Sequence, residues 1–222
     1  MTTKTKTNYF LKSLEQYKEI RKVEGKKPEL LLHVCCGACS CYPLVFLYDL
    51  FDITILFSNS NIYPKSEFDH RLDALRKYVD QVNYMFNQHI KIIVDDYVHE
   101  EYMKDLMPFK ELKEGGHRCH LCITKRLQRL FQYASENNYK YVTTVMTVSR
   151  NKPVDFINEV GEKLSAKYPG ITFFHTDFKK FNGQDVGVAI SKKFGVYRQE
   201  SCGCEFSISE ENSDVINKDK ID

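Results

Sequence analysis

The sequence predicts one α/β domain in which helices cover both faces of a parallel β-sheet. Apolar, β-rich runs alternate along the chain with segments of roughly 10 to 20 residues that have helical periodicity, a pattern typical of parallel sheets. The chain has 222 residues, 42% hydrophobic and 28% charged, which suits one sizeable core. Chemically unusual polar residues follow several of the predicted strands. These observations indicate a doubly wound, Rossmann-like arrangement.

Five segments are predicted strands, because each is a short apolar run bounded by polar or turn-forming residues. In chain order they are ELLLHVC at 29–35, DITILFSN at 52–59, IKIIVDD at 90–96, YVTTVMT at 141–147 and ITFFHTD at 171–177. Helical segments are predicted between them at about 40–50, 65–86, 98–107, 119–138 and 153–168. A further helix is expected after the last strand, at about 184–194, and an amphipathic helix before the first, near 9–23.

The domain organisation follows from the same pattern. We expect a helical extension at 1–28, a Rossmann-like catalytic domain at 29–207 and a disordered polar tail at 208–222. The formal net charge of +2 neither indicates nor excludes a nucleic-acid partner. The basic residues near the N-terminus suit a solvated helix face better than a site for a polyanion.

The cysteine content and the expected compartment point to metal or redox chemistry. No apolar run approaches the roughly 18 residues that cross a bilayer, and the charged N-terminus lacks the apolar region of a secretory signal. We therefore expect a cytoplasmic protein with reduced thiols and no membrane partner. In that compartment eight cysteines favour metal binding or redox chemistry over a disulfide framework.

The cysteines occur in three groups with short internal spacings. The first strand runs into CCGACSC, while RCHLC and ESCGC occur much later in the chain. A C-x-x-C at the start of a helix places two sulfurs one turn apart on one face, and a C-x-C with a central glycine turns readily. Cys41 is expected to be an ordinary buried cysteine. The candidate metal ligands are Cys35, Cys36, Cys39, Cys119, Cys122, Cys202 and Cys204.

Three interpretations of these thiols compete. Ordinary burial explains one or two of them but not the three motifs together. Structural zinc takes four ligands, usually in two pairs about 12 to 20 residues apart, whereas the later pairs here are separated by roughly eighty residues. An iron–sulfur cluster with up to four thiolate ligands leaves three thiols for a mononuclear metal with an open position. The count favours this third interpretation.

Other polar residues follow the strands and are candidates for the same crevice, because ligands bind beyond the carboxyl ends of parallel strands. His33 fits either a buried core histidine or a support for a ligand. Asn59, Asn61 and Tyr63 fit either a turn or recognition of a base. Arg126 lies on a basic helix that fits phosphate binding. Asp177 is a candidate acid, and Tyr197 and Arg198 precede the last thiols. No glycine-rich dinucleotide motif follows a strand, so we expect no NAD or FAD site.

The motifs together resemble the cobalamin-independent epoxyqueuosine reductase family, QueH. The resemblance covers about 29–207 and is carried by LLHVCCGACS, SNSNIYPKSEFDHRL, EGGHRCHLCITKRL, TTVMTVS, DFKK and YRQESCGC. It implies a Rossmann-like domain similar to those of ATP-pyrophosphatase tRNA-modifying enzymes, with thiols where those relatives have a phosphate loop. It also implies reduction of epoxyqueuosine to queuosine at the wobble position of tRNA, with a 4Fe-4S cluster beside a second metal, expected to be iron. Ala38 stands where proline is common, and the position of Cys39 varies between members, which leaves the division of ligands open.

The resemblance leads to a mechanistic hypothesis. The anticodon loop of tRNA carrying epoxyqueuosine docks at the carboxyl edge of the sheet, and the open metal acts as a Lewis acid on the epoxide oxygen. An external donor such as a ferredoxin or flavodoxin supplies electrons. The residues assigned to stacking are Tyr63 and Tyr197, those assigned to hydrogen bonding are Asn59, Asn61 and Arg198, and the acid is Asp177 or Tyr197.

Two other functions stay open at this point. The main alternative is a non-catalytic, zinc-dependent tRNA-binding protein. A thiol–disulfide oxidoreductase is a weaker alternative, because such proteins need one C-x-x-C motif and not seven thiols.

Overall fold

The protein is built around a five-stranded parallel sheet. The computed structural model describes residues 7–22 and 26–207. The strand order is β3-β2-β1-β4-β5, and all four neighbouring pairs are parallel. This is the order of a Rossmann-type sheet, so the predicted fold class is confirmed. The strands are β1 (Glu29–His33), β2 (Asp52–Phe57), β3 (Lys91–Val94), β4 (Tyr141–Thr144) and β5 (Thr172–Phe173).

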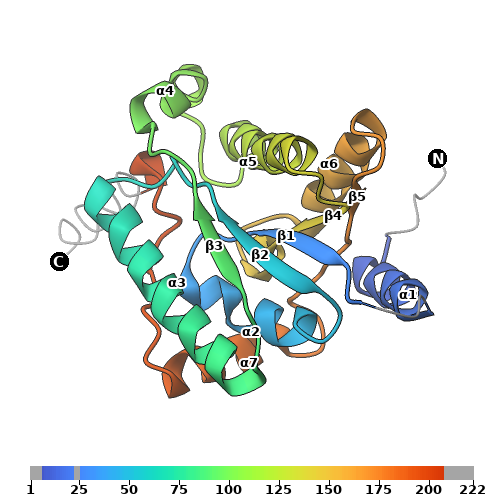
Figure 1. Ribbon diagram of the computed structural model, residues 1–222. Helices are drawn as coiled ribbons and strands as arrows, with labels where there is room; N and C mark the ends of the chain where they lie inside the picture. The colour runs from blue at the N-terminus through green and yellow to red at the C-terminus, as the bar shows by residue number, and fades with distance from the viewer. Residues whose placement is uncertain (1–6, 23–25, 208–222) are drawn as a thin grey trace.

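Helices cover both faces of this sheet (Figure 1). In chain order they are α1 (Tyr9–Lys22), α2 (Gly37–Leu47), α3 (Lys65–Phe86), α4 (His99–Lys104), α5 (His117–Glu136), α6 (Val154–Lys167) and α7 (Gly183–Lys193), with short 3₁₀ turns η1 (Met107–Phe109) and η2 (Val145–Val148). Helices α2, α3 and α7 lie on one face, and α5 and α6 lie on the other. The predicted helix at 65–86 is reproduced residue for residue.

The two cores follow from the alternation of side chains along β1. Leu30 and Leu32 pack into the core beneath α2 and α3, whereas Leu31 packs into the core beneath α5 and α6. Successive residues of a strand point to opposite faces, so a continuous run of leucines suits a strand that is buried on both sides. The middle strand is therefore held from above and below, and its carboxyl end is a rigid platform.

Strands β4 and β5 end earlier than the sequence predicts, for local reasons. β4 ends at Thr144, because the Thr144 hydroxyl accepts the backbone N–H of Met146 and starts the η2 turn. β5 is only two residues long, since the Asn158 side chain bonds both the N–H and the carbonyl of Thr176 where a strand would continue. Side chains thus replace the ladder at the edge where the site lies.

Helix α1 packs against the β5 side of the domain. The Gln16 side chain donates to the carbonyl of Phe173 (3.1 Å) and accepts the N–H of His175 (2.8 Å). Lys12 pairs with Glu162 of α6 at 2.7 Å. The predicted N-terminal helix is confirmed, while the predicted tail at 208–222 lies outside the described residues. No helix within 7–22 and 26–207 is long and apolar enough to cross a membrane.

Candidate metal centre and substrate cavity

The first thiol group lies in the turn between β1 and α2. The Sγ atoms of Cys35, Cys36 and Cys39 all lie within 4.8 Å of one another. Cys36 is the N-cap of α2, and its sulfur accepts the backbone N–H of Cys39 at 3.3 Å. Gln199 approaches from the C-terminal segment, and its Nε2 donates to the sulfur of Cys36 at 2.8 Å. The sequence therefore folds three soft ligands into one cluster that could hold a metal ion.

The same three thiols form a proton-sharing group. Hydrogen bonds from Cys36 and Cys39 lower the pKa of the Cys35 thiol well below its ordinary value. Burial raises the pKa of Cys36, and the bond to Cys35 is the main cause that raises the pKa of Cys39 to about 12. Ionisation of Cys35 is therefore favoured over ionisation of its two neighbours. Soft metals bind thiolates, so the group is suited to exchange its protons for a metal.

The second thiol group combines α5 with the C-terminal segment. Cys119 and Cys122 lie in the first turns of α5, and they line one small cavity together with Cys202 and Cys204. The Tyr102 hydroxyl lies 3.3 Å from the sulfur of Cys122. Burial is the first cause that raises the pKa of Cys119, Cys122 and Cys204, the last to about 12. Four soft donors thus surround one space.

The C-x-C turn depends on its glycine. Gly203 has φ +83°, a conformation that side chains rarely adopt. A Cβ atom at this position would lie 2.7 Å from Nη2 of Arg71, whose guanidinium donates to the carbonyls of Ser201 and Cys202. The carbonyl of Gly203 accepts the N–H of Tyr63 at 2.7 Å. These bonds place the C-terminal thiols beside the segment that follows β2.

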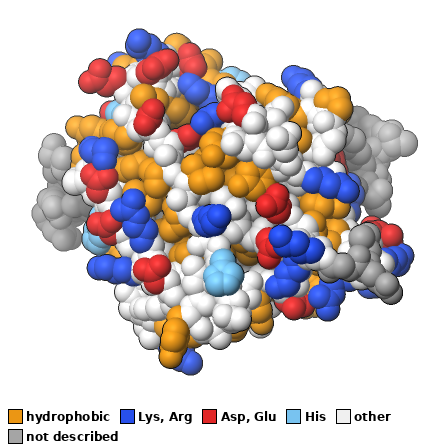
Figure 2. Space-filling model, in the orientation of Figure 1, with side chains coloured by type: hydrophobic (Ala, Val, Ile, Leu, Met, Phe, Trp, Pro, Cys, Tyr) orange, Lys and Arg blue, Asp and Glu red, His pale blue; other side chains and the backbone are white. Residues whose placement is uncertain are grey.

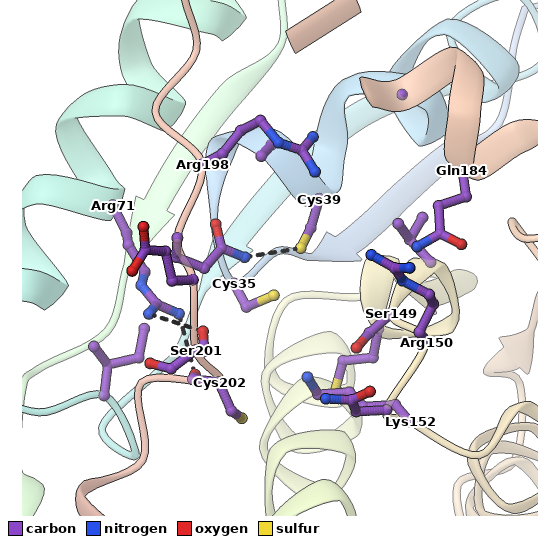
Figure 3. A pocket seen from close by; sticks show the side chains of 18 of the residues that line it. Cys35, Cys39, Arg71, Ser149, Arg150, Lys152, Gln184, Arg198, Ser201 and Cys202 are labelled. Carbon is purple, nitrogen blue, oxygen red and sulfur yellow. Dashed lines mark hydrogen bonds between the residues drawn. The ribbon is translucent and has the colours of Figure 1, made fainter. Parts of the chain in front are cut away.

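The two thiol groups border neighbouring cavities. A cavity of about 410 Å³, here called the substrate cavity, is lined by Cys35, Cys39 and Cys202. Cys202, Arg126 and Lys152 line both this cavity and the small space of the second group. Figure 3 shows Cys35 and Cys39 on one wall and the side chains of the 149–152 segment on another. Thiols from three distant parts of the sequence therefore meet in one place.

A buried polar network supports the first thiol turn from below. The Arg126 guanidinium donates to Asn59 Oδ1 (2.9 Å) and to His33 Nε2 (3.4 Å), and His33 Nδ1 lies 2.8 Å from the Thr144 hydroxyl. Asn59 in turn donates to the carbonyl of Val34 at 2.8 Å. Burial first, and then the charge of Arg126, lower the pKa of His33 to about 3. The histidine is neutral, so it can accept the guanidinium bond.

Three of the five predicted substrate-binding residues, Asn61, Arg126 and Arg198, line the substrate cavity, and Asn59 and Tyr63 do not. Asn59 is 1% exposed and both its amide atoms are used in the network, while Arg126 is 2% exposed and reaches the substrate cavity. Asn61 lines the substrate cavity, and its Oδ1 is buried without a partner among the described residues. Arg198 also lines the cavity. Tyr63 is 45% exposed and packs against the ring of His99, outside the cavity lining.

The two predicted acids, Asp177 and Tyr197, both lie outside the lining of the substrate cavity. Asp177 lines a second cavity of about 680 Å³, here called the adjoining cavity, and accepts the backbone N–H of Lys179. The Tyr197 hydroxyl donates to Glu67, and its ring stacks on His70 at 3.9 Å. Neither side chain lines the substrate cavity. Their catalytic role stays a prediction.

Several site residues were not among those picked from the sequence. Lys152 borders both thiol groups, Gln199 bonds two thiols, and Arg71 holds the C-x-C segment. Arg71 is 2% exposed, although an arginine on a helix that follows a strand end is more often solvated. Its pairing with Glu67 four residues earlier was a visible signal. Cys41, by contrast, is fully buried and outside both groups, as predicted.

Comparison with known proteins identifies the family. The model of the family "Epoxyqueuosine reductase QueH" matches residues 30–210, which is most of the chain. The chain belongs to this family. Its thiol motifs and the segments around them all lie inside the matched range, so the family resemblance drawn from the motifs is confirmed. By its name, this is a family of oxidoreductases.

Individual relatives agree. The chain is 33% identical over 216 residues to the epoxyqueuosine reductase QueH of Streptococcus pyogenes serotype M1, covering 97% of this chain and 84% of the relative. It is 34% identical over 184 residues to the protein of the same name from Thermotoga maritima, covering 82% and 91%. Among solved structures, a predicted tRNA methyltransferase subunit from Methanocaldococcus jannaschii is 12% identical with a TM-score of 0.42, covering 72% and 74%, which is too distant to bear on function.

Proposed function

We propose that this chain reduces epoxyqueuosine to queuosine in tRNA. The observation that carries the proposal is that seven thiols meet in a member of the QueH family. A group of three borders the substrate cavity, and a group of four surrounds the small space beside it. Reduction of an epoxide to an alkene takes two electrons and two protons and releases water. The proposed cofactors are a 4Fe-4S cluster and a mononuclear metal, expected to be iron.

We assign the group of three thiols to the mononuclear metal and the group of four to the cluster, and the sulfur spacing supports this division. The sulfurs of a tetrahedral site with metal–sulfur bonds of about 2.3 Å lie roughly 3.8 Å apart. Among the described residues, Cys35, Cys36 and Cys39 are the one group of three such ligands within 4.8 Å, which suits a single ion. The other four thiols surround a shared space at wider spacing, which suits a larger inorganic core. The chemistry of both donor sets fits these groups.

When bound, the two metal groups would supply electrons one at a time and a Lewis acid for the epoxide oxygen. The chain's own residues bind and orient the base. The Oδ1 of Asn61 and the Oε1 of Gln199 are buried acceptors without partners in the described part of the chain, and both residues line the substrate cavity. Such acceptors suit the N–H and O–H donors of a nucleobase edge. Arg198 contributes a donor, and Tyr63 an aromatic surface at the outer side.

The proton donor is proposed to be Asp177 or Tyr197. Tyr197 adjoins the cavity residue Arg198 in sequence, and its hydroxyl is already in contact with the Glu67 carboxylate, a route for replacing a proton. Asp177 borders the adjoining cavity, which shares a wall with the substrate cavity. Measuring turnover against pH for Asp177→Asn and for Tyr197→Phe identifies the proton donor.

The electrons come from outside the chain in this proposal. A ferredoxin or flavodoxin is the proposed donor, because two single-electron deliveries match cluster chemistry. An RNA substrate and oxygen-sensitive thiol centres support a cytoplasmic location.

The test is anaerobic reconstitution with iron and sulfide, followed by mass spectrometry of digested tRNA that carried epoxyqueuosine. The wild-type protein should bind about five irons per chain, the sum of the two proposed groups, and form queuosine. Cys122→Ala should abolish turnover and most sulfide binding, because the cluster loses a ligand. Cys41→Ala is the matched control and should keep both. A colourless, iron-free, zinc-loaded protein that binds tRNA without turnover would establish the zinc-dependent binding protein instead.

A further inference from the structure

The adjoining cavity lies directly beside the substrate cavity. Its volume is about 680 Å³, and residues Arg150, Asn151 and Lys152 line both cavities. Both volumes fall in the range of small-ligand sites, several hundred Å³. The three shared residues therefore form a ridge, here called the 150–152 ridge, with one cavity on each side. Figure 3 shows Arg150 and Lys152 on the wall that faces the thiols.

The 150–152 ridge is held in place by a lysine. The Nζ atom of Lys179 donates to the carbonyls of Ser149 (3.1 Å) and Lys152 (3.2 Å), at the two ends of the ridge. The backbone N–H of Lys152 also donates to Ser149. A segment without helix or strand thus has its backbone carbonyls satisfied by a charged donor. Arg150 is consequently presented from a defined position.

The charges of the adjoining cavity favour an anion. Four cationic side chains line it against two carboxylates: Arg150, Lys152, Lys179 and Lys180 against Asp155 and Asp177. Arg150 and Lys180 are exposed, come from different segments of the chain, and have side chains without a hydrogen-bond partner among the described residues. On the face in Figure 2, basic and acidic side chains are interspersed. Two free cations beside one cavity suit the oxygens of a phosphodiester.

The cavity also contains a surface suited to a base. The ring of His120 lines it and is stacked on Phe156, with ring centres 4.2 Å apart and an angle of 20° between the rings. An aromatic ring fixed from behind is a platform on which an unstacked base can lie. The amides of Asn8 and Asn151 line the same cavity and can hydrogen-bond a base edge. Cations, a ring and amides together match one nucleotide.

We propose that the adjoining cavity holds the nucleotide next to the modified one, with Arg150 and Lys180 binding the phosphate that joins the two. The modified base then occupies the substrate cavity, and the RNA backbone crosses the 150–152 ridge. The inference rests on the proposed function for the identity of the RNA. It adds a recognition site for the nucleotide adjacent to the modified one in the RNA. A single free nucleoside has no such neighbour and cannot use this site.

The test measures binding of an anticodon stem-loop RNA to the reconstituted full chain by fluorescence anisotropy at several salt concentrations. Lys180→Ala should weaken binding about three- to tenfold and lower the slope of log affinity against log salt by about 1, the loss of one phosphate contact. The matched control is Lys91→Ala, an exposed lysine at the amino end of β3, on the opposite edge of the sheet. It should bind like the wild type. Equal weakening by both variants overturns the proposal.

A double-mutant cycle with the RNA locates the contact. One charged linkage beside the modified nucleotide is replaced by an uncharged methylphosphonate, on the 5′ side in one RNA and on the 3′ side in another. For one of the two RNAs, the replacement should weaken binding to the wild type but add nothing to Lys180→Ala or Arg150→Ala. Fully additive effects for both linkages contradict the proposal.

Binding and turnover separate the two proposals. Coupling between Lys180 and one linkage, in a wild-type protein that forms no queuosine, would support the RNA site and defeat the proposed function. Queuosine formation without any coupling would support the function and overturn the RNA site.

Discussion

Gly203 shows how one missing side chain lets two cysteines face the same space. Its φ of +83° turns the chain between Cys202 and Cys204, and the guanidinium of Arg71 fills the volume that a Cβ would occupy. The C-G-C spacing predicts the turn, since glycine is the residue that adopts this conformation readily. The arginine that packs against it lies about 130 residues earlier in the chain, and no local pattern reveals it.

Gly203→Ala should therefore destabilise both the protein and the proposed metal centre. The left-handed backbone conformation costs an alanine about 1–2 kcal/mol of unfolding free energy, and the clash with Arg71 should add about 1–3 kcal/mol. The control is Gly170→Ala, where φ is +89° but no atom lies within 4 Å, so only the backbone cost applies. Urea unfolding and iron content measure both effects. Equal losses of stability in the two variants would show that Arg71 simply moves away.

Also at the scale of single residues, spacing in the sequence predicted which thiols meet better than it predicted the partners of the amide side chains. The convergence of Cys119 with Cys122 follows from one helical turn, a local rule. Asn59 and Arg126 bond each other, and Arg126 also bonds His33, although the three residues are far apart in the sequence. Their burial is therefore a product of tertiary structure. The chemical type of a residue was predictable, but its partner was not.

Among the elements, an ion pair close to the site joins α5 to Asp95, the residue that follows β3. Arg129 donates two hydrogen bonds to Asp95, at 2.6 and 2.7 Å. Burial alone would raise the pKa of Asp95, but the bonds from Arg129 and Ser58 and the charge of Arg129 outweigh it and the pKa is lowered. A lowered carboxyl pKa means that the ionised form is favoured in the folded state. The pair therefore stabilises the fold only where Asp95 is ionised.

Asp95→Asn should cost about 1–3 kcal/mol of unfolding free energy at neutral pH. The contribution of Asp95 is complete above its ordinary pKa of 3.8 and disappears as the pH falls through the lower folded value. The stability difference between wild type and variant should consequently shrink in acid. Asp73→Asn, in an exposed i,i+3 pair, is the control and should change little. Denaturant titrations at pH 7 and pH 3 test this, and a difference independent of pH would contradict it.

The order of the main helices and strands was predictable, but their ends and the two 3₁₀ turns were not. α2 begins three residues before its predicted start at 40, because the sulfur of Cys36 caps it. Cysteine is not among the residues whose capping role is expected from sequence. The predicted helix at 98–107 is divided into α4 and the η1 turn. For α2, a contact particular to this site decided the boundary.

For the whole molecule, the parallel topology accounts for the assembly of the site. β1 and β4 are neighbours, so the turn after β1 and the segment after β4 lie at one edge of the sheet. This was predictable, because carboxyl ends of parallel strands share an edge. The return of the C-terminal segment across that edge was not, since residues 196–204 contain neither helix nor strand.

Removal of metal should consequently loosen the whole site. The apo protein is expected to unfold at a lower temperature than the reconstituted protein, because ligand binding to the folded state adds to its stability. Cys122→Ala should reduce the difference between the two forms, whereas Cys41→Ala should keep it. Calorimetry with and without a chelator, under anaerobic conditions, measures it. Identical midpoints for both forms would show that the thiols contribute nothing as ligands.

The segment at 196–204 is attached by individual hydrogen bonds and not by a sheet ladder. The side chain of Gln199 donates to Cys36, that of Arg71 donates to two carbonyls, and the backbone N–H of Tyr63 donates to the carbonyl of Gly203. A closure of this kind can form after the sheet is complete. A chain that has lost these contacts should therefore keep its sheet and lose only the position of Cys202 and Cys204.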